Sequence, residues 1–177
     1  MVGQPQKDIY EVIRDLGKYP LDAFQFVQEG LSYAVMEVHG EMSPEQQELH
    51  KFMYEQAIDL DRLEYLQLNG ELPEQIQELL AQVGDIDQLN RHVSGQHLCW
   101  GLRNFAHKKF GALASAVLNH WNIRRTRDFG EIIFALVDNE FLQKQPNDSI
   151  DDFDEVYQFA EALDRSFKID LSKNARD

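Results

Sequence analysis

Apolar residues recur at three- and four-residue spacing along most of the chain, which is the pattern of amphipathic helices. The longest run follows Pro20, a residue suited to the first turn of a helix, and Gly40 is expected to end it. Its apolar face is broad, so this run predicts a central helix. Six further helices are predicted at residues 7–16, 43–69, 73–83, 94–110, 112–121 and 127–139.

Polar residues at several helix starts can satisfy the backbone N–H groups of the first turn. Ser43, Pro44 and Gln46 have the spacing of a capping box, with the proline at the first helical position. Ser94 and Thr126 are expected to cap the helices that follow them. The last two predicted helices have the spacing of a helix-turn-helix unit.

The residues after position 140 allow two interpretations. In the first, residues 141–144 and 156–159 form short strands, which gives the carboxyl half the element order of a winged helix. In the second, Ser149 begins a capping box and residues 150–163 form a last helix. Both interpretations give a mainly α fold with at most a small β-hairpin.

The length of 177 residues and the 43% of hydrophobic residues predict a single domain over residues 1–177. The acidic residues 41–90 predict a helical hairpin inserted into it, and residues 91–165 hold the helix-turn-helix half. No apolar stretch approaches the roughly 20 residues of a membrane-spanning helix, and the first residues lack a secretory signal pattern. With Cys99 as the single cysteine, these features predict a cytoplasmic protein that does not bind membranes.

The chain is acidic overall, with a formal net charge of -14, but its middle is basic. Residues 91–127 contain seven Lys and Arg residues and neither Asp nor Glu. This segment either packs against the acidic flanks and neutralises them, or forms an exposed patch that attracts an anionic partner.

The exposed-patch alternative selects candidate residues for binding an anion or an acidic partner. Ser94 begins a helix whose first-turn N–H groups and dipole favour negative charge, and Gly95 would let an anion approach closely. A second basic helix start precedes Asp128, which already complements the dipole there. The predicted binding residues are Arg91, His92, Ser94, Gly95, Gln96, Arg103, Arg124, Arg125 and Arg127.

Other kinds of chemistry have weaker support in the sequence. His92, His97 and Cys99 fall short of the four ligands of a structural zinc site, so no metal is expected. No phosphate-binding glycine loop, dinucleotide motif or nucleophile elbow is present, so we expect no cofactor, and the sequence favours a binding module over an enzyme.

Several short motifs can be compared with known families. They are His92-Val93-Ser94-Gly95-Gln96, Leu98-Cys99-Trp100-Gly101, Thr126-Arg127-Asp128-Phe129-Gly130, and Asp148-Ser149 with Asp152-Phe153 and Val156-Tyr157. Together they resemble a family of uncharacterised bacterial proteins, found mainly in planctomycetes, verrucomicrobia and their relatives. The resemblance spans residues 5–40 and 90–165, while His97 replaces the Glu of the family pattern and residues 41–90 form a longer insert. The family has no assigned function, so the resemblance implies a fold and no activity.

The leading hypothesis is therefore a non-enzymatic interaction or regulatory module whose basic middle segment contacts an acidic protein partner or a small anion. A nucleic-acid-binding regulator of winged-helix type is the alternative, although residues 127–140 carry a net charge of -3, which opposes phosphate approach. An enzyme with an unrecognised site, built on His92, His97 or His107 beside an acidic group, is a second alternative.

Overall fold

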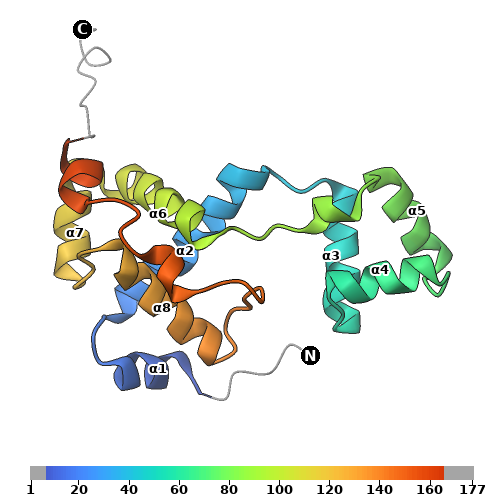
Figure 1. Ribbon diagram of the computed structural model, residues 1–177, viewed down its shortest axis with the longest axis horizontal. Coiled ribbons are helices and arrows are strands. Elements are labelled where there is room, and N and C mark those ends of the chain that lie inside the picture. Colours follow the sequence, from blue (N-terminus) through green and yellow to red (C-terminus); the bar gives the residue numbers. More distant parts are fainter. Residues whose placement is uncertain (1–6, 166–177) are drawn as a thin grey trace, which may run out of the picture. The chain divides into compact units, whose positions relative to one another are not determined.

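Helices make up all of the regular secondary structure in residues 7–165, the part of the chain that the computed structural model describes (Figure 1). The mainly α prediction is confirmed. The α-helices are α1 (Ile9–Leu16), α2 (Leu21–His39), α3 (Pro44–Gln56), α4 (Leu60–Leu68), α5 (Glu74–Val83), α6 (Gly95–Phe110), α7 (Ala114–His120) and α8 (Thr126–Asp138). Shorter helical turns are η1 (Ile86–Leu89), η2 (Gly111–Leu113), η3 (Ile150–Phe153) and η4 (Ala160–Arg165).

Several helices begin where their capping residues predict. The Ser43 hydroxyl accepts the N–H of Gln46, the Gln46 side chain accepts the N–H of Ser43, and Pro44 is the first residue of α3. Ser94 caps α6 in the same way, by accepting a first-turn N–H. The predicted helix over residues 43–69 is interrupted, because Ala57 adopts a left-handed backbone with φ 50° and ends α3.

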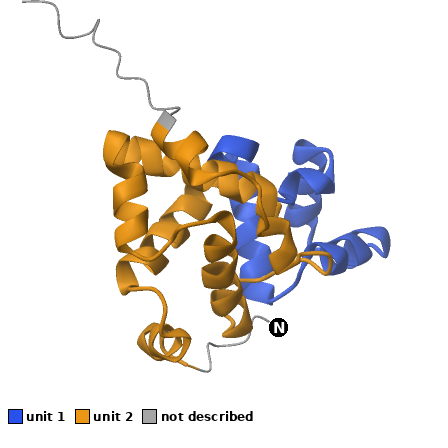
Figure 2. Ribbon diagram, turned by 60° about the vertical axis from the view of Figure 1, so that its left-hand side comes forward, with its two compact units in different colours: residues 1–3, 35–92 blue, residues 4–34, 93–177 orange. Residues whose placement is uncertain are grey.

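The described chain folds into two compact units (Figure 2). One unit holds residues 35–92, so its boundary falls inside α2 and close to the predicted insert at 41–90. Its core gathers inward-facing residues of α3, α4, α5 and the turns beside them. These core residues are Leu49, Met53, Leu63, Leu72, Leu80 and Leu89.

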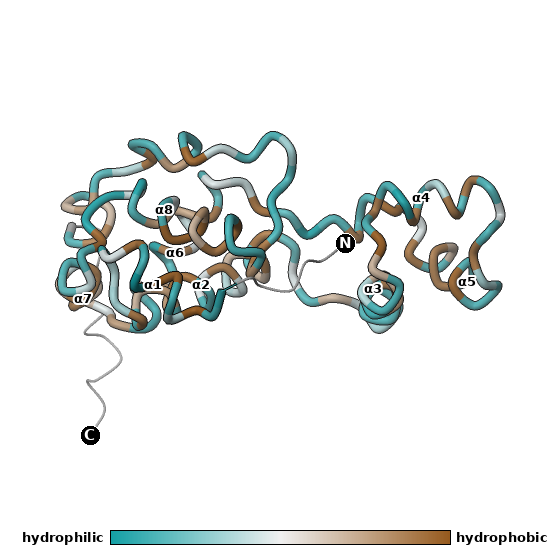
Figure 3. Tube along the Cα trace, turned by 90° about the horizontal axis from the view of Figure 1, so that it is seen from below, coloured by the Kyte–Doolittle hydropathy of each residue, from teal (hydrophilic) through white to brown (hydrophobic). Residues whose placement is uncertain are grey.

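The other unit, called the second unit below, combines residues 7–34 with residues 93–165. The hydrophobic parts of α2, α6 and α8 gather at its centre (Figure 3). Phe26 of α2 is 1% exposed, and its ring contacts aromatic rings from three other helical segments. These rings are Phe105, Phe110, Trp121 and Phe129.

Small residues bring α2 and α6 close together. A Cβ atom at Gly101 would lie 2.4 Å from the Cβ of Ala34, and one at Gly30 would lie 2.4 Å from the Leu102 side chain. Neither distance leaves room for a methyl group. Gly30 therefore serves the packing of the predicted central helix against α6.

The predicted β-hairpin is wrong for the described residues, because neither 141–144 nor 156–159 forms a strand. Glu155 has φ 48°, a left-handed backbone that interrupts an extended segment, and the Val156 N–H donates to the Thr126 hydroxyl instead of to a neighbouring strand. The alternative of one helix over residues 150–163 is also wrong, for the same reason. Its capping box at Ser149 is present, but it begins only the short turn η3.

Candidate functional site

A cleft of about 570 Å³ with three arginines in its lining lies at the start of α8, in the second unit. One wall is the turn that leads into α8, and the other is the segment between η3 and η4. The volume falls within the range of about 300–1,000 Å³ that is typical of ligand sites. Its lining residues are Arg124, Arg125, Thr126, Arg127, Asp154, Glu155, Tyr157, Gln158 and Phe159.

Asp128 holds the arginine-bearing wall in place from beneath. Its side chain is 4% exposed, and its Oδ2 atom accepts the backbone N–H groups of Arg124 at 2.7 Å and of Arg125 at 3.0 Å. These two bonds fix the backbone from which both guanidinium groups extend. Asp128, rather than the predicted Thr126, is therefore the acceptor that caps the start of α8.

The other oxygen of Asp128 joins this wall to the start of α2. Lys18 Nζ lies 2.9 Å from Asp128 Oδ1 and 2.7 Å from Glu131 Oε2, and the Tyr19 hydroxyl lies 2.8 Å and 2.7 Å from the same two atoms. Burial alone would raise the pKa of Asp128, but the hydrogen bonds from Arg124 N–H, Lys18 and Tyr19 together hold it below its usual value. Asp128 is thus an anion already satisfied by its own chain.

The Tyr19 hydroxyl stays protonated in this network. Burial is the largest cause that raises the pKa of Tyr19, and the hydrogen bonds to Glu131 and Asp128 raise it further. A protonated hydroxyl can donate to one of the two carboxylates, so it serves as a fixed donor and not as a base. The arrangement anchors the α1–α2 turn to α8.

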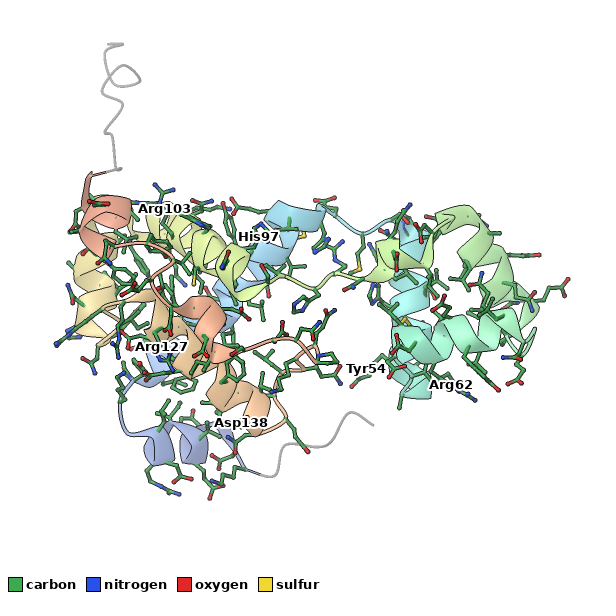
Figure 4. The ribbon with its side chains drawn as sticks, in the orientation of Figure 1. Tyr54, Arg62, His97, Arg103, Arg127 and Asp138 are labelled. Atoms are coloured by element: carbon green, nitrogen blue, oxygen red, sulfur yellow. The ribbon has the colours of Figure 1, made fainter. Side chains whose placement is uncertain are left out.

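The three arginines of the cleft differ in how far their own chain neutralises them. Arg127, labelled in Figure 4, forms ion pairs with Asp154 at 2.5 Å and with Asp151 at 3.3 Å, and these bonds raise its pKa. Arg125 is 67% exposed at its side chain and reaches Asp128 only at 3.8 Å. Arg124 is exposed and forms no ion pair with any residue between 7 and 165.

An aromatic surface continues the second wall of the cleft. The Tyr157 ring stacks on Phe159 at 5.8 Å, and its hydroxyl donates to the Cys99 carbonyl oxygen at 2.9 Å. On its other side Tyr157 contacts Trp100 at 4.8 Å between ring centroids. Trp100 is 44% exposed, and the Arg103 guanidinium lies 5.8 Å from its ring. Tyr157 therefore links the cleft to an exposed aromatic residue of α6.

Four of the predicted binding residues, Ser94, Gly95, Gln96 and Arg103, lie elsewhere in the second unit. Ser94 is exposed and bonds His97, and Gln96 is exposed on the first turn of α6. Arg103 donates to the Ala162 carbonyl oxygen at 2.9 Å and to the Asn104 side chain. Backbone and amide oxygens therefore hold its guanidinium.

Gly95 does not offer an open approach to a ligand, which corrects the role expected for it from the sequence. A Cβ atom at this position would lie 2.8 Å from Asp152 Cβ and 2.8 Å from the Phe153 ring. The space in front of Gly95 is therefore filled by η3. A glycine is required there by packing, because nothing larger admits Phe153.

Arg91 and His92 belong to the unit of residues 35–92. Arg91 donates to the Gly40 carbonyl oxygen at 2.6 Å, and His39 Nε2 bonds the His92 carbonyl oxygen at 2.9 Å. Both contacts tie the end of α2 to the segment that follows η1. The nine predicted residues are thus spread over several surfaces, and Arg124, Arg125 and Arg127 are those that share one cleft.

The described residues that could ligate a metal or act as a nucleophile do not gather into a site for either chemistry that we can identify. Between residues 7 and 165, no three His, Cys, Asp or Glu side chains cluster in a way that could hold a metal ion. Burial raises the pKa of the Cys99 thiol to about 12, which keeps it protonated at neutral pH.

The parts of the site that come from distant segments have no signal in the sequence. Lys18 and Tyr19 lie about a hundred positions before Asp128, and no local pattern indicates their contact. The wall around Tyr157 was missed because the pattern of residues 156–159 fits a strand or a helix. Asp128 itself carries a signal, since an acid in the first turn of a helix commonly accepts N–H groups.

No family model, curated protein or solved structure matches this chain. The resemblance to an uncharacterised bacterial family therefore stays a prediction. Within residues 7–165, no helix has both the length and the apolar character needed to cross a bilayer.

Proposed function

We propose that the protein is a non-enzymatic binding module and that the cleft at the start of α8 receives an anionic group of its partner, either a small anion or an acidic side chain of a protein. The observation that carries the proposal is the state of Arg124 and Arg125. Both arginines line the cleft and are exposed; Arg124 has no ion pair among the described residues, and Arg125 has only the 3.8 Å contact with Asp128.

The charge distribution of the chain favours anion binding at the cleft over most other positions. Residues 41–90 and the carboxyl-terminal part of the chain are acidic, so an anion is repelled over most of the sequence and attracted at few positions. Within the cleft, Asp154 is paired with Arg127, and Arg124 and Arg125 outnumber the other lining carboxylate, Glu155. Arginine suits this role because its planar guanidinium bonds carboxylate and phosphate oxygens in pairs.

The backbone supports the same role by fixing the two arginines before a ligand arrives. Asp128 accepts both of their backbone N–H groups, and Lys18 and Tyr19 immobilise Asp128 in turn. A wall that is already ordered loses less conformational entropy on binding. The side chains remain free to adjust to the ligand.

Fluorescence anisotropy with a fluorescein-labelled hexaglutamate peptide tests the proposal. We expect the double variant Arg124→Glu with Arg125→Glu to abolish binding. The double variant Lys51→Glu with Arg62→Glu makes the same charge change at exposed residues of the other unit and should leave binding nearly unchanged. Binding should weaken as salt rises from about 50 to 200 mM, because exposed charges are screened over about 8–10 Å in that range. Equal loss in both variants would mean that only net charge matters, and the proposal would fail.

Inorganic phosphate, added as a competitor, distinguishes a small anion from an acidic peptide. Displacement of the peptide at millimolar phosphate would identify the anion itself as the ligand. If the peptide stays bound in millimolar phosphate, further contacts along an acidic segment contribute to its binding.

Single-stranded nucleic acid is a second candidate, favoured by Trp100. This side chain is 44% exposed beside Tyr157, which lines the cleft, and stacking aromatics next to arginines are typical of single-strand binding. Duplex recognition has less support, because α8 carries Glu131 and Asp138 and the described residues contain no wing. A labelled dT12 oligonucleotide tested with Trp100→Ala separates this candidate from the peptide.

A further inference from the structure

A second concave surface lies where α1 packs against α8. It is a groove of about 430 Å³ within the second unit, so both of its walls belong to the same compact part of the chain. Its floor is apolar and combines residues of α1, α8 and η3. The floor residues are Val12, Leu16, Phe134, Ala135 and Ile150.

Carboxylates form the rim of this groove. Asp15, Glu131 and Asp138 line it together with a single basic residue, Lys7. Asp15 is paired with Lys7 at 2.6 Å, and Glu131 shares Lys18 with Asp128. Asp138 is exposed and has no ion pair with any residue in the described range (Figure 4). Asp138 is therefore the lining carboxylate that is left without a counter-ion in the described range.

The chain's own lysines already show how a cation fits this surface. Lys144 Nζ lies 5.4 Å from the centroid of the Phe134 ring, which forms part of the floor. Lys7 bonds Asp15 at the rim. An ammonium group is thus held once over the aromatic floor and once at the acidic edge, by a cation–π contact and by an ion pair.

We infer that this groove docks a basic amphipathic segment of a partner protein, with an apolar side chain on the floor and a Lys or Arg at Asp138. Charge complementarity selects this occupant: the rim is acidic, its Asp138 lacks a counter-ion among the described residues, and the chain as a whole carries -14. A field of this sign accelerates the approach of a cationic partner. The inference does not depend on the anion-binding cleft.

A fluorescein-labelled helical peptide of about 18 residues, with Leu on one face and Lys on the other, is a suitable probe. We expect Asp138→Lys to weaken its binding at least about tenfold, which corresponds to about 1.4 kcal/mol. Glu78→Lys, the same charge change on an exposed residue of α5, is the matched control and should change binding less than twofold. A peptide with Gln in place of Lys should bind at least tenfold more weakly than the probe.

A second variant tests the apolar floor. Ala135→Trp fills the groove without changing its charge, and we expect it to abolish probe binding while circular dichroism remains that of the parent protein. The double variant at Arg124 and Arg125 should leave probe binding intact, because it alters only the other site.

Three results would overturn the inference. Equal weakening by Asp138→Lys and Glu78→Lys would reduce it to general charge attraction, and unchanged binding in folded Ala135→Trp would exclude the groove. Sedimentation that shows a dimer dissociated by Ala135→Trp would identify a second copy of this chain as the occupant.

Discussion

The Phe153 ring of η3 lies so close to Gly95 of α6 that there is no space for a methyl group between them. A Cβ atom at position 95 would meet the ring at 2.8 Å, and one at Gly130 of α8 would meet the same ring at 2.8 Å. One buried aromatic side chain, 3% exposed, thus packs against glycines of two helices. This contact sets the position of the segment that forms the second wall of the cleft.

Replacing Gly95 with alanine should destabilise the second unit by about 1–3 kcal/mol, the usual cost of overpacking a core. In an ordinary helix, replacing glycine with alanine would stabilise the protein by up to about 1 kcal/mol. The sign of the change therefore shows whether Gly95 is needed for packing against Phe153 or is an ordinary helical residue. Both tryptophans, Trp100 and Trp121, lie in this unit, and their fluorescence during urea unfolding reports on it. Gln96→Ala, at the next and exposed position, is the control and should change stability by less than about 0.5 kcal/mol.

Removing the Tyr19 hydroxyl should also weaken the second unit. Tyr19→Phe deletes a hydrogen bond to a buried carboxylate, which typically contributes about 1.5–3 kcal/mol. Tyr10→Phe is a matched control, since Tyr10 is 66% exposed on α1. The same unfolding measurement applies. Equal midpoints for the two variants would show that the Asp128 network does not need this donor.

Asp154→Asn should tighten anion binding in the cleft. The change removes one carboxylate from the lining and releases Arg127 from its shortest ion pair. Exposed pairs contribute about 0.2–1 kcal/mol, so affinity for hexaglutamate should rise by up to about fivefold. Asp61→Asn in α4 makes the same charge change in the other unit. A similar gain there would assign the effect to net charge.

The unit of residues 35–92 should lose stability in mild acid because of His50. Its Nε2 atom is buried and has no hydrogen-bond partner among the described residues. Burial is the largest cause that lowers its pKa, Arg91 lowers it further, and a bond with the Leu89 backbone opposes both. The folded protein therefore favours neutral His50, so this stability is present above the unfolded pKa of 6.5 and is lost as pH falls below it.

Hydrogen exchange of α3 amides at about pH 7.5 and about pH 5.5, on either side of that pKa, measures this loss. We expect faster exchange at the lower pH, after correction for the intrinsic rate, in the parent protein and a smaller change in His50→Gln. His120→Gln, at an exposed histidine of α7, should behave like the parent. A pH response that survives unchanged in His50→Gln would assign the effect to other groups.

Local features of this fold were predictable from the sequence, and distant contacts were not. The capping box at Ser43 and the cap at Ser94 involve residues three positions apart, so their patterns identify them directly. Residues 156–159 contain apolar side chains at strand-like spacing, yet their conformation depends on Thr126 and on the left-handed Glu155. The spacing of apolar residues indicates neither the contact with Thr126 nor the left-handed backbone of Glu155.

The candidate cleft likewise has one wall that the sequence predicts and one that it does not. Its basic wall was predictable because Arg124, Arg125 and Arg127 are neighbours in sequence. The opposite wall was not, because the position of the segment that forms it depends on Phe153, which packs against two glycines on other helices. The sequence suggests Gly95 as a place where a ligand approaches, whereas its absent side chain is needed for Phe153.

The anchoring of Phe153 has a consequence for how this protein can change over evolutionary time. Because η3 is fixed by its own cap and by the two glycines, the preceding loop, whose Lys144 contacts Phe134, is not needed to hold the binding wall in place. Its length is free to drift by insertion or deletion without disturbing the binding wall. A substitution at Gly95 or Gly130, in contrast, would be removed by selection unless position 153 shrank at the same time.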